Sequence, residues 1–173
     1  MRTLLCVVAP LLVVSLPAAA QQQGFQDPLL DRLAGNWVMR GTIAGAETTH
    51  DIAAEWVLDH QYLRFHDVSH EKGSGDVPEY EAIVFIGWDQ SSAQYACLWL
   101  DSTGGGGLDV DAQVIGHAKP DGDELAFLFE LNDGGIIHTT FKYNREADTW
   151  QWLVDVEEGE EFRSFARVVL TRR

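Results

Sequence analysis

The fold of this chain is decided by residues 80–101, which read YEAIVFIGWDQSSAQYACLWLD. Two runs rich in β-branched and aromatic residues, Tyr80–Trp88 and Gln94–Asp101, flank the polar segment Asp89-Gln90-Ser91-Ser92. Such runs are typical of strands, and the residues between them tolerate a tight turn. A connection this short predicts that the two strands are antiparallel neighbours.

The same succession of strand-like runs and turns continues along most of the chain, with almost no period of 3.6 residues. The predicted strands are Trp37–Ile43, Thr48–Leu58, Tyr62–His70, Tyr80–Trp88, Gln94–Asp101, Leu108–Ala118, Glu124–Leu131, Ile136–Asn144, Trp150–Val156 and Glu161–Thr171. Short connections favour a meander, and closing such a sheet into a barrel removes its exposed edges. We therefore predict an all-β fold, a single antiparallel up-and-down β-barrel of about ten strands.

A short helical turn is predicted ahead of the first strand. Residues 28–33, PLLDRL, follow Asp27, which suits a helix N-cap, and Pro28 suits the first helical position. Residues 21–27 form a polar leader that we expect to be flexible. The chain has 173 residues and no visible repeat, so residues 28–173 are predicted to form one domain.

The first twenty residues have the pattern of a secretory signal peptide. A short positive start with Arg2 precedes the apolar run Leu4–Leu16, and Ala18 and Ala20 occupy the small-residue positions before a cleavage site. We expect cleavage near Ala20-Gln21 and a secreted or periplasmic location. The apolar run is too short for a spanning helix, so no stable membrane insertion is expected.

The charge balance restricts the class of partner. The chain has 27 acidic and 12 basic side chains, a formal net charge of −15. Nucleic acids and anionic lipid surfaces are bound by clustered Lys and Arg, so neither is an expected partner. A small-molecule ligand is expected instead, and the oligomeric state stays open.

Cysteine usage indicates how the fold is held together. Removal of residues 1–20 leaves Cys97 as the remaining cysteine, which rules out a disulfide within the mature chain. Cys97 lies in an apolar segment and is expected to be a buried, unreactive thiol. The packed core must therefore stabilise this domain.

Alternation along the strands predicts a partly polar barrel interior. In Tyr62–His70, one face has Leu63, Phe65, Asp67 and Ser69, and the other has Tyr62, Arg64, His66, Val68 and His70. In Tyr95–Asp101, one face has Tyr95, Cys97, Trp99 and Asp101. Both faces contain apolar residues, so the pattern leaves open which one faces inward.

No common catalytic motif occurs, neither H-E-x-x-H nor G-x-S-x-G, C-x-x-C or G-x-G-x-x-G. No catalytic residue is therefore assigned, and Asp101 is the weak candidate, either as a proton-transfer group or as a cap of the glycine turn that follows it. Large rings line apolar cavities, and histidine or arginine can fix the polar end of a ligand. The candidate ligand-binding residues are Trp37, Trp56, Arg64, His66, Trp88, Trp99, Asp101 and His138.

The histidines do not form a recognisable metal site, and no metal or other cofactor is predicted. His66 and His70 are four residues apart on one strand, roughly 13 Å, which is too far for one ion. His50, His117 and His138 lie on other predicted strands and could converge inside a barrel, but a structural or surface role is favoured because their facing is open. His138, in the run Ile136–Thr140, is the weak candidate for a haem ligand if it faces inward. A hydrogen-bonded polar residue inside the barrel is the alternative for His138.

A family resemblance is carried by two sets of residues. Gly35-Asn36-Trp37 looks like the G-x-W signature that begins lipocalin-like, or calycin, barrels. Further motifs follow in order: Glu55-Trp56-Val57-Leu58, Gly87-Trp88-Asp89, Gln94-Tyr95, Trp99-Leu100-Asp101-Ser102 and a terminal Thr171-Arg172. Together they resemble a bacterial secreted lipocalin-like family of unknown function (domain of unknown function 1579), over about residues 29–173.

This resemblance implies a calycin-type barrel but no reaction. Fatty-acid-binding barrels and the haem-binding nitrobindins are more distantly similar. The chain matches nitrobindins at Gly35, Trp37 and Gly41, then departs from them at Thr42-Ile43-Ala44, where they have further glycines and a Tyr-Pro pair. In lipocalins a late arginine packs over the G-x-W ring, and Arg167 and Arg172 are both candidates here.

Two functions of different classes remain. The first is binding of a small, largely apolar ligand inside the barrel. The second is an enzyme on the same barrel that uses an interior carboxylate and a histidine for acid–base chemistry. A haem or metal carrier is a further alternative, and fold alone does not separate these functions.

Overall fold

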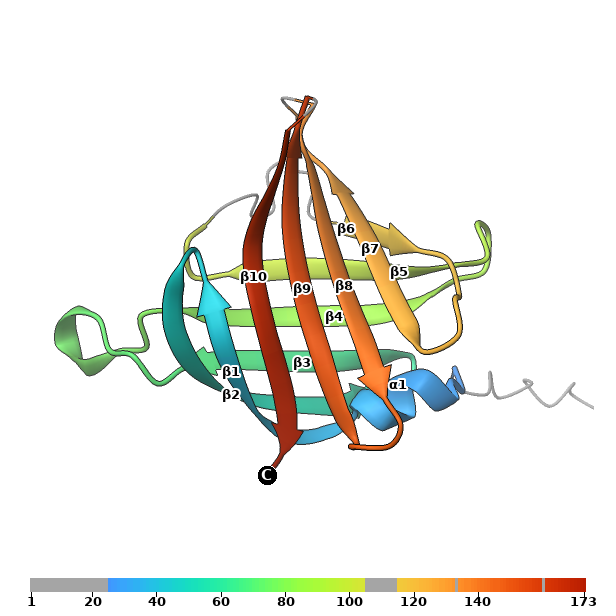
Figure 1. Cartoon of the computed structure of the whole chain (residues 1–173). Helices are drawn as coiled ribbons and strands as arrows, with labels where there is room; N and C mark the ends of the chain where they lie inside the picture. Colours follow the sequence, from blue (N-terminus) through green and yellow to red (C-terminus); the bar gives the residue numbers. More distant parts are fainter. Residues whose placement is uncertain (1–24, 105–114, 133, 160) are drawn as a thin grey trace, which may run out of the picture.

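The computed structural model describes residues 25–104, 115–132, 134–159 and 161–173, and it is built almost entirely of strands (Figure 1). Its elements are α1 (Pro28–Leu33), β1 (Gly35–Ile43), β2 (Ala46–Val57), β3 (Tyr62–Ser69), the 3-10 turn η1 (Ser74–Asp76), β4 (Glu81–Asp89), β5 (Gln94–Asp101), β6 (Ile115–Ala118), β7 (Glu124–Glu130), β8 (Ile136–Asn144), β9 (Thr149–Glu158) and β10 (Glu161–Arg172). The predicted signal peptide, most of the predicted leader and the predicted start of the sixth strand at Leu108 lie outside the described residues.

All ten strands belong to one closed antiparallel barrel. Each strand pairs with its neighbours in the chain, and β1 pairs with β10 to close the circle. The register at the closure sets Trp37 opposite Arg172 and Gly41 opposite Val168. The predicted meander of ten strands is confirmed, as is its closure. This architecture is consistent with a calycin, or lipocalin-like, barrel.

The barrel has two groups of strands that cross one another. Figure 1 shows β8, β9 and β10 running steeply across one side, while β3, β4 and β5 run at a large angle to them behind. Strand twist and tilt produce such crossing when a sheet closes on itself. The two groups face each other across the interior.

The short helix covers one end of the barrel, which we call the cap end. The carboxylate of Asp27 accepts hydrogen bonds from the backbone N–H groups of Leu29 and Leu30, at 2.8 and 2.9 Å. Pro28 is at the helix start, as the sequence predicts. Leu30 and Leu33 are fully buried, so α1 is held by its apolar face on the barrel. We call the opposite end of the barrel the distal end.

Burial now fixes which face of each strand points inward. On β3 the face with Leu63, Phe65, Asp67 and Ser69 is buried, and Tyr62 on the other face is 44% exposed. The largest fully buried side chains are Trp37, Trp150, Phe65, Phe127, Phe141, Leu30, Leu33, Met39, Leu63, Ile86, Leu125 and Leu170. Cys97 is also buried, and burial raises the pKa of its thiol, in agreement with the expected unreactive role.

Gly41 permits a close approach between the first and last strands. Its φ angle is +147°, and a Cβ atom there would lie 2.2 Å from the backbone oxygen of Arg167. A side chain is therefore excluded at this position, since no displacement of a flexible group can relieve a backbone contact.

In the described part of the chain, no helix is long and apolar enough to cross a membrane.

Candidate ligand-binding cavity

The distal half of the barrel contains a cavity of about 810 Å³. Its lining comes from strand ends and turns: the β1–β2 turn at Ile43 and Ala46, the β3–β4 connection at Glu71 and Glu79, and the β7–β8 connection at Leu131. The cap end, by contrast, is filled by the packed helix and rings. The cavity is therefore a gap in the core at one end of the barrel.

Aromatic rings form much of the cavity wall. Trp99 of β5 and Trp152 of β9 both line it, with ring centroids 5.4 Å apart. Trp152 in turn stacks on Phe141, with centroids 5.5 Å apart and planes 7° from parallel. Phe129, Phe165 and Tyr80 also line it. Such walls suit the apolar body of a small molecule.

A buried polar pair lies at this end of the barrel. His50 of β2 and Asp67 of β3 have their Nδ1 and Oδ1 atoms 2.6 Å apart, and the two residues are 3% and 0% exposed. His50 lines the cavity. The pair follows from strand register, because His50 pairs with Ser69 across β2 and β3 and Asp67 is the next inward residue on β3.

The second oxygen of Asp67 is buried without a hydrogen-bond partner among the described residues. Burial raises the pKa of the Asp67 carboxyl above its usual value of 3.8, although the contact with His50 acts in the opposite direction. Leaving a buried polar atom unpaired costs stability. The buried His50–Asp67 pair, with one oxygen unpaired among the described residues, is therefore expected to lower the stability of the folded protein.

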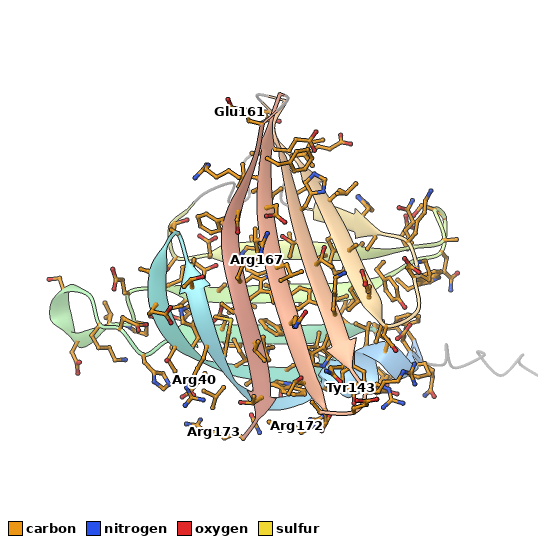
Figure 2. The ribbon with its side chains drawn as sticks, viewed as in Figure 1. Arg40, Tyr143, Glu161, Arg167, Arg172 and Arg173 are labelled. Atoms are coloured by element: carbon orange, nitrogen blue, oxygen red, sulfur yellow. The ribbon has the colours of Figure 1, made fainter. Side chains whose placement is uncertain are left out.

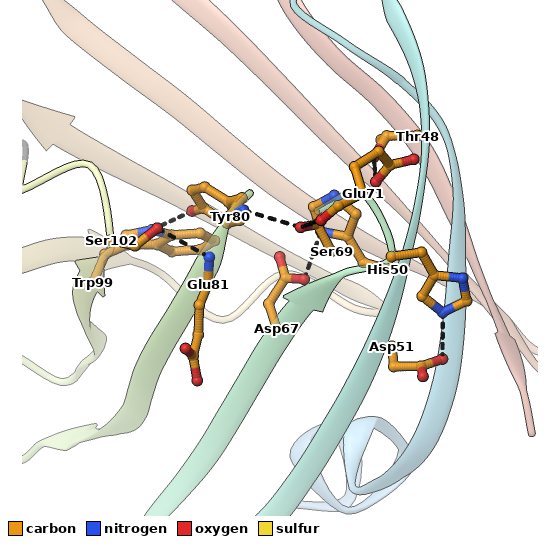
Figure 3. Close-up of polar contacts among 11 residues, drawn as sticks. Thr48, His50, Asp51, Asp67, Ser69, Glu71, Tyr80, Glu81, Trp99 and Ser102 are labelled. Atoms are coloured by element: carbon orange, nitrogen blue, oxygen red, sulfur yellow. Dashed lines mark hydrogen bonds and ion pairs between the residues drawn. The ribbon is translucent and has the colours of Figure 1, made fainter. Parts of the chain in front are cut away.

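Tyr80 connects the cavity wall to the β3–β4 connection (Figure 3). Its backbone N–H donates to the Ser69 hydroxyl at 2.9 Å, and its own hydroxyl accepts from the Trp99 indole at 3.3 Å. The Ser69 hydroxyl donates to the backbone oxygen of Glu71 at 3.0 Å. Burial and the nearby Asp101 carboxylate both raise the pKa of Tyr80, so its phenol stays protonated.

Four carboxylates, Glu47, Glu71, Glu79 and Asp101, also line the cavity, and we call them the cavity carboxylates. Glu71 is held by a hydrogen bond from the Thr48 hydroxyl at 3.0 Å. A hydrogen bond from its own backbone N–H lowers the pKa of the Glu71 carboxyl, and so does the bond from Thr48, although burial acts in the opposite direction. Asp101 accepts from the backbone N–H and the hydroxyl of Thr103, at 2.9 and 2.5 Å. Asp101 therefore makes the predicted turn bond and lines the cavity as well.

Of the eight candidate ligand-binding residues, the structure brings two to the cavity, Trp99 and Asp101. Their role in binding stays a prediction. The other six lie elsewhere, in two groups with different physical reasons.

Three of the tryptophans belong to the cap end. Trp37 is fully buried and donates from its indole to the backbone oxygen of Leu33 at 2.8 Å. Trp56 donates to the Asp31 carboxylate at 2.9 Å, and Trp88 stacks on Phe25 with centroids 5.8 Å apart. These rings fasten the helix and the segment before it to the barrel instead of lining the cavity.

The three basic candidates lie on the outer face of the barrel. Arg64 forms an ion pair with Glu55, and His66 contacts Glu81 at 2.6 Å. His138 contacts Glu157 at 2.7 Å, with 30% of its side chain exposed. His138 therefore does not face inward, and its alternation with the buried Thr139 is the reason. None of these three residues is among the described residues that line the cavity.

Sequence reasoning did not select His50, Asp67, Tyr80 and Trp152 as site residues. A signal for Asp67 existed, because it alternates with Leu63 and Phe65 on one strand face. No signal in the sequence pointed to Tyr80, because it lies in the long connection that precedes β4. Trp152 lies in the predicted strand Trp150–Val156, but nothing in the sequence distinguished it from a core ring, and both Trp150 and Trp152 are buried.

Among the described residues, no group of three or more His, Cys, Asp or Glu side chains is arranged to hold a metal ion. Searches with models of protein families and against curated proteins found no match to this chain.

Proposed function

We propose that this protein binds a small, largely apolar molecule in the distal cavity and is a carrier or sensor of that molecule. The observation that carries the proposal is the cavity of about 810 Å³ inside an otherwise packed barrel. Natural ligand sites measure about 300–1,000 Å³ and are mostly apolar with a few polar groups. This cavity has that size and that composition.

The packing of the cap end supports a binding role for the distal end. If the barrel were only a structural module, large rings would be expected to fill both halves alike, because voids forfeit packing energy. Here Trp37, Trp150 and Leu33 are fully buried at the cap end. The large cavity lies at the distal end, and the pocket beside α1 at the cap end is much smaller, about 300 Å³.

We further propose that the chain is exported after removal of residues 1–20, and that it belongs to the bacterial lipocalin-like family of unknown function. The signal-peptide pattern supports export. The G-x-W signature and the later Trp99-Leu100-Asp101-Ser102 motif support the family. The barrel architecture is compatible with both proposals.

Titration with N-phenyl-1-naphthylamine, an apolar dye whose emission rises in dry surroundings, tests the binding function. We expect saturable binding to the purified protein. Val156→Trp and Ile137→Trp each place a large ring at the cavity wall and are expected to weaken dye binding at least about tenfold through lost volume.

Val169→Trp is the matched control. It puts the same ring in place of another valine, on the outer face of β10, where Val169 is 40% exposed. Dye binding should be unchanged in this variant. No dye binding by the folded wild type, or equal binding by all four proteins, would contradict a ligand site in the cavity.

The His50–Asp67 pair favours one second candidate, an enzyme that performs acid–base chemistry at the cavity wall. A buried carboxyl with a raised pKa beside an imidazole is a common arrangement for proton transfer. The test is incubation of a small-molecule extract with wild type and with Asp67→Asn. A compound consumed by wild type alone supports the enzyme, and unchanged recovery in both samples rules against it.

A further inference from the structure

We propose that the ligand of the distal cavity carries a positive charge, so that the site selects an apolar amine or quaternary ammonium compound and disfavours a fatty acid. This inference rests on the proposed binding function and names its ligand class. It follows from the signs of the charges around the cavity, and an unpaired indole N–H in the wall indicates that a ligand is bound there.

The charge lining the cavity is of one sign. Glu47, Glu71, Glu79 and Asp101 all line it, and among its described lining residues there is no lysine or arginine. His50 is the one histidine of that lining, and it already contacts the Asp67 carboxyl. A carboxylate ligand would meet like charges here, whereas a cation would be attracted.

The basic side chains are used elsewhere on the molecule. Six described ion pairs place lysine or arginine against acidic residues outside the cavity: Arg64–Glu55, Lys142–Glu124, Arg145–Asp123, Arg167–Asp155, Arg172–Asp148 and Arg173–Asp51. The acidic residues of the outer face are therefore partly neutralised. None of these six ion pairs includes a cavity carboxylate, so these lysine and arginine side chains do not offset the negative charge at the cavity.

The apolar walls strengthen this effect. Charges of one sign beside low-dielectric walls focus the field into a cleft. The aromatic residues of the lining, Trp99 and Tyr80 among them, add a further attraction wherever a cation lies over a ring face. Aromatic walls combined with carboxylates form the usual chemistry for holding a cationic amphiphile.

One buried atom of this wall points independently to an absent partner. Trp152 lines the cavity and is 4% exposed, yet its indole N–H has no hydrogen-bond partner in the described structure. Buried polar groups without partners are rare in folded proteins, and an absent water or ligand atom is a common explanation. An indole N–H donates, so it indicates that this wall is a binding surface, whereas the sign of the ligand charge is set by the cavity carboxylates.

Three probes with the same ten-carbon chain separate charge from apolarity: decyltrimethylammonium, decan-1-ol and decanoate. Each is used at neutral pH to displace N-phenyl-1-naphthylamine from the purified wild-type protein. We expect the cation to bind at least about tenfold more tightly than decanoate, with the alcohol between them. The preference should shrink as salt is raised to roughly 0.5 M.

Conservative variants locate the charge. Glu71→Gln combined with Asp101→Asn keeps the acceptor oxygens for Thr48 and Thr103 and removes two negative charges. We expect weaker binding of the cation, tighter binding of decanoate and unchanged binding of decanol. Glu130→Gln is the control, because Glu130 is exposed on β7 and does not line the cavity.

The outcomes separate this inference from the proposed function. If decanol displaces the dye while decanoate binds as tightly as the cation, the inference is overturned and the binding function stands. The inference is also overturned if the double variant keeps the cation preference of wild type. If the dye fails to bind and no probe is bound by the folded protein, the proposed function itself fails.

Discussion

The guanidinium carbon of Arg172 lies 4.2 Å from the ring centroid of Trp37. The end of the last strand, β10, therefore covers the tryptophan ring near the start of the first strand, β1. The two residues are paired in register across β1 and β10. Arg172 also donates to the backbone oxygens of Ala34 and Arg32, at 3.2 and 3.0 Å, and to the Asp148 carboxylate at 2.6 Å. One side chain thus joins β10, the end of the helix and the β8–β9 turn at the cap end (Figure 2).

Arg172→Ala is expected to lower the free energy of unfolding by about 1–3 kcal/mol. It removes the contact with the Trp37 ring and takes one donor away from each of the backbone oxygens of Ala34 and Arg32. Arg172→Lys keeps the charge but not the planar fork of donors, so it should recover only part of the loss. Denaturant unfolding of the three proteins measures the differences.

Arg40→Ala is the control for this prediction, because Arg40 is exposed on β1, the strand that pairs with β10, and its loss should cost no more than about 0.5 kcal/mol. Equal stability of Arg172→Ala and Arg40→Ala would show that the contact of Arg172 with Trp37 does not stabilise the barrel. Dye binding at the distal end should be the same in all these proteins.

The barrel could be predicted from sequence because its evidence is local. Each strand has its own alternation and each turn its own residues, as in Tyr80–Asp101, so ten independent signals support one architecture. The cap was equally local, with Asp27 and Pro28 at the start of α1. The resemblance left Arg167 and Arg172 open as the arginine over Trp37, and only the closing register of β1 with β10 decides for Arg172.

The candidate site was harder to predict, because it depends on two properties that the sequence of a single strand does not determine. One is the inward face, which separates the buried Asp67 from its outward neighbour His66. The other is the end of the barrel. Odd-numbered strands run from the cap end to the distal end, so Trp99, late in β5, reaches the cavity, whereas Trp88, late in β4, reaches the cap.

The Asp67 carboxyl is expected to make stability depend on pH. Its pKa in the folded protein is raised above the usual 3.8, chiefly by burial. The folded state therefore holds this proton more tightly than the unfolded chain, and the contribution of Asp67 to stability is present below about pH 4 and lost as pH rises through the folded-state pKa.

Asp67→Asn isolates this contribution, since an amide does not titrate. The unfolding free energy of wild type minus that of the variant should fall as pH rises from about 4, by about 1.4 kcal/mol for each unit by which the pKa is raised. Chemical unfolding across this pH range measures it. A difference that stays flat, or that grows with pH, would contradict the raised pKa.

Asp27 is expected to stabilise the cap end by joining the helix to the barrel. Its Oδ1 caps α1, and its Oδ2 accepts from the Tyr95 hydroxyl at 2.6 Å. Asp27→Ala should lower the free energy of unfolding by about 1–3 kcal/mol, from the lost cap and the unpaired phenol. Thermal or denaturant unfolding measures the loss.

Asp27→Asn is the matched variant, because asparagine caps helices about as well as aspartate. It should retain most of the stability of wild type. If alanine at this position were as stable as asparagine, the capping bond and the Tyr95 bond would not contribute. Both variants should bind the dye like wild type, since the cavity is lined by residues at the distal end.

The position of the ligand can be read from tryptophan emission, because the six tryptophans are divided between the two ends of the barrel. Trp99 and Trp152 line the distal cavity. Trp88 packs at the cap end against Phe25 and Tyr95. Decan-1-ol neither absorbs nor emits near the indole bands, so a change on its addition reports contact or altered polarity around a ring.

We expect decanol to shift or quench the emission of wild type, and the change to disappear in the Trp99→Phe, Trp152→Phe double variant. Dye displacement shows in parallel that this variant still binds decanol. Trp88→Phe is the control and should keep the full change. Loss of the change in Trp88→Phe, with retention in the double variant, would place the ligand at the cap end. That result would also contradict recognition of the ligand by the cavity carboxylates, because they line the distal cavity and Trp88 packs at the cap end.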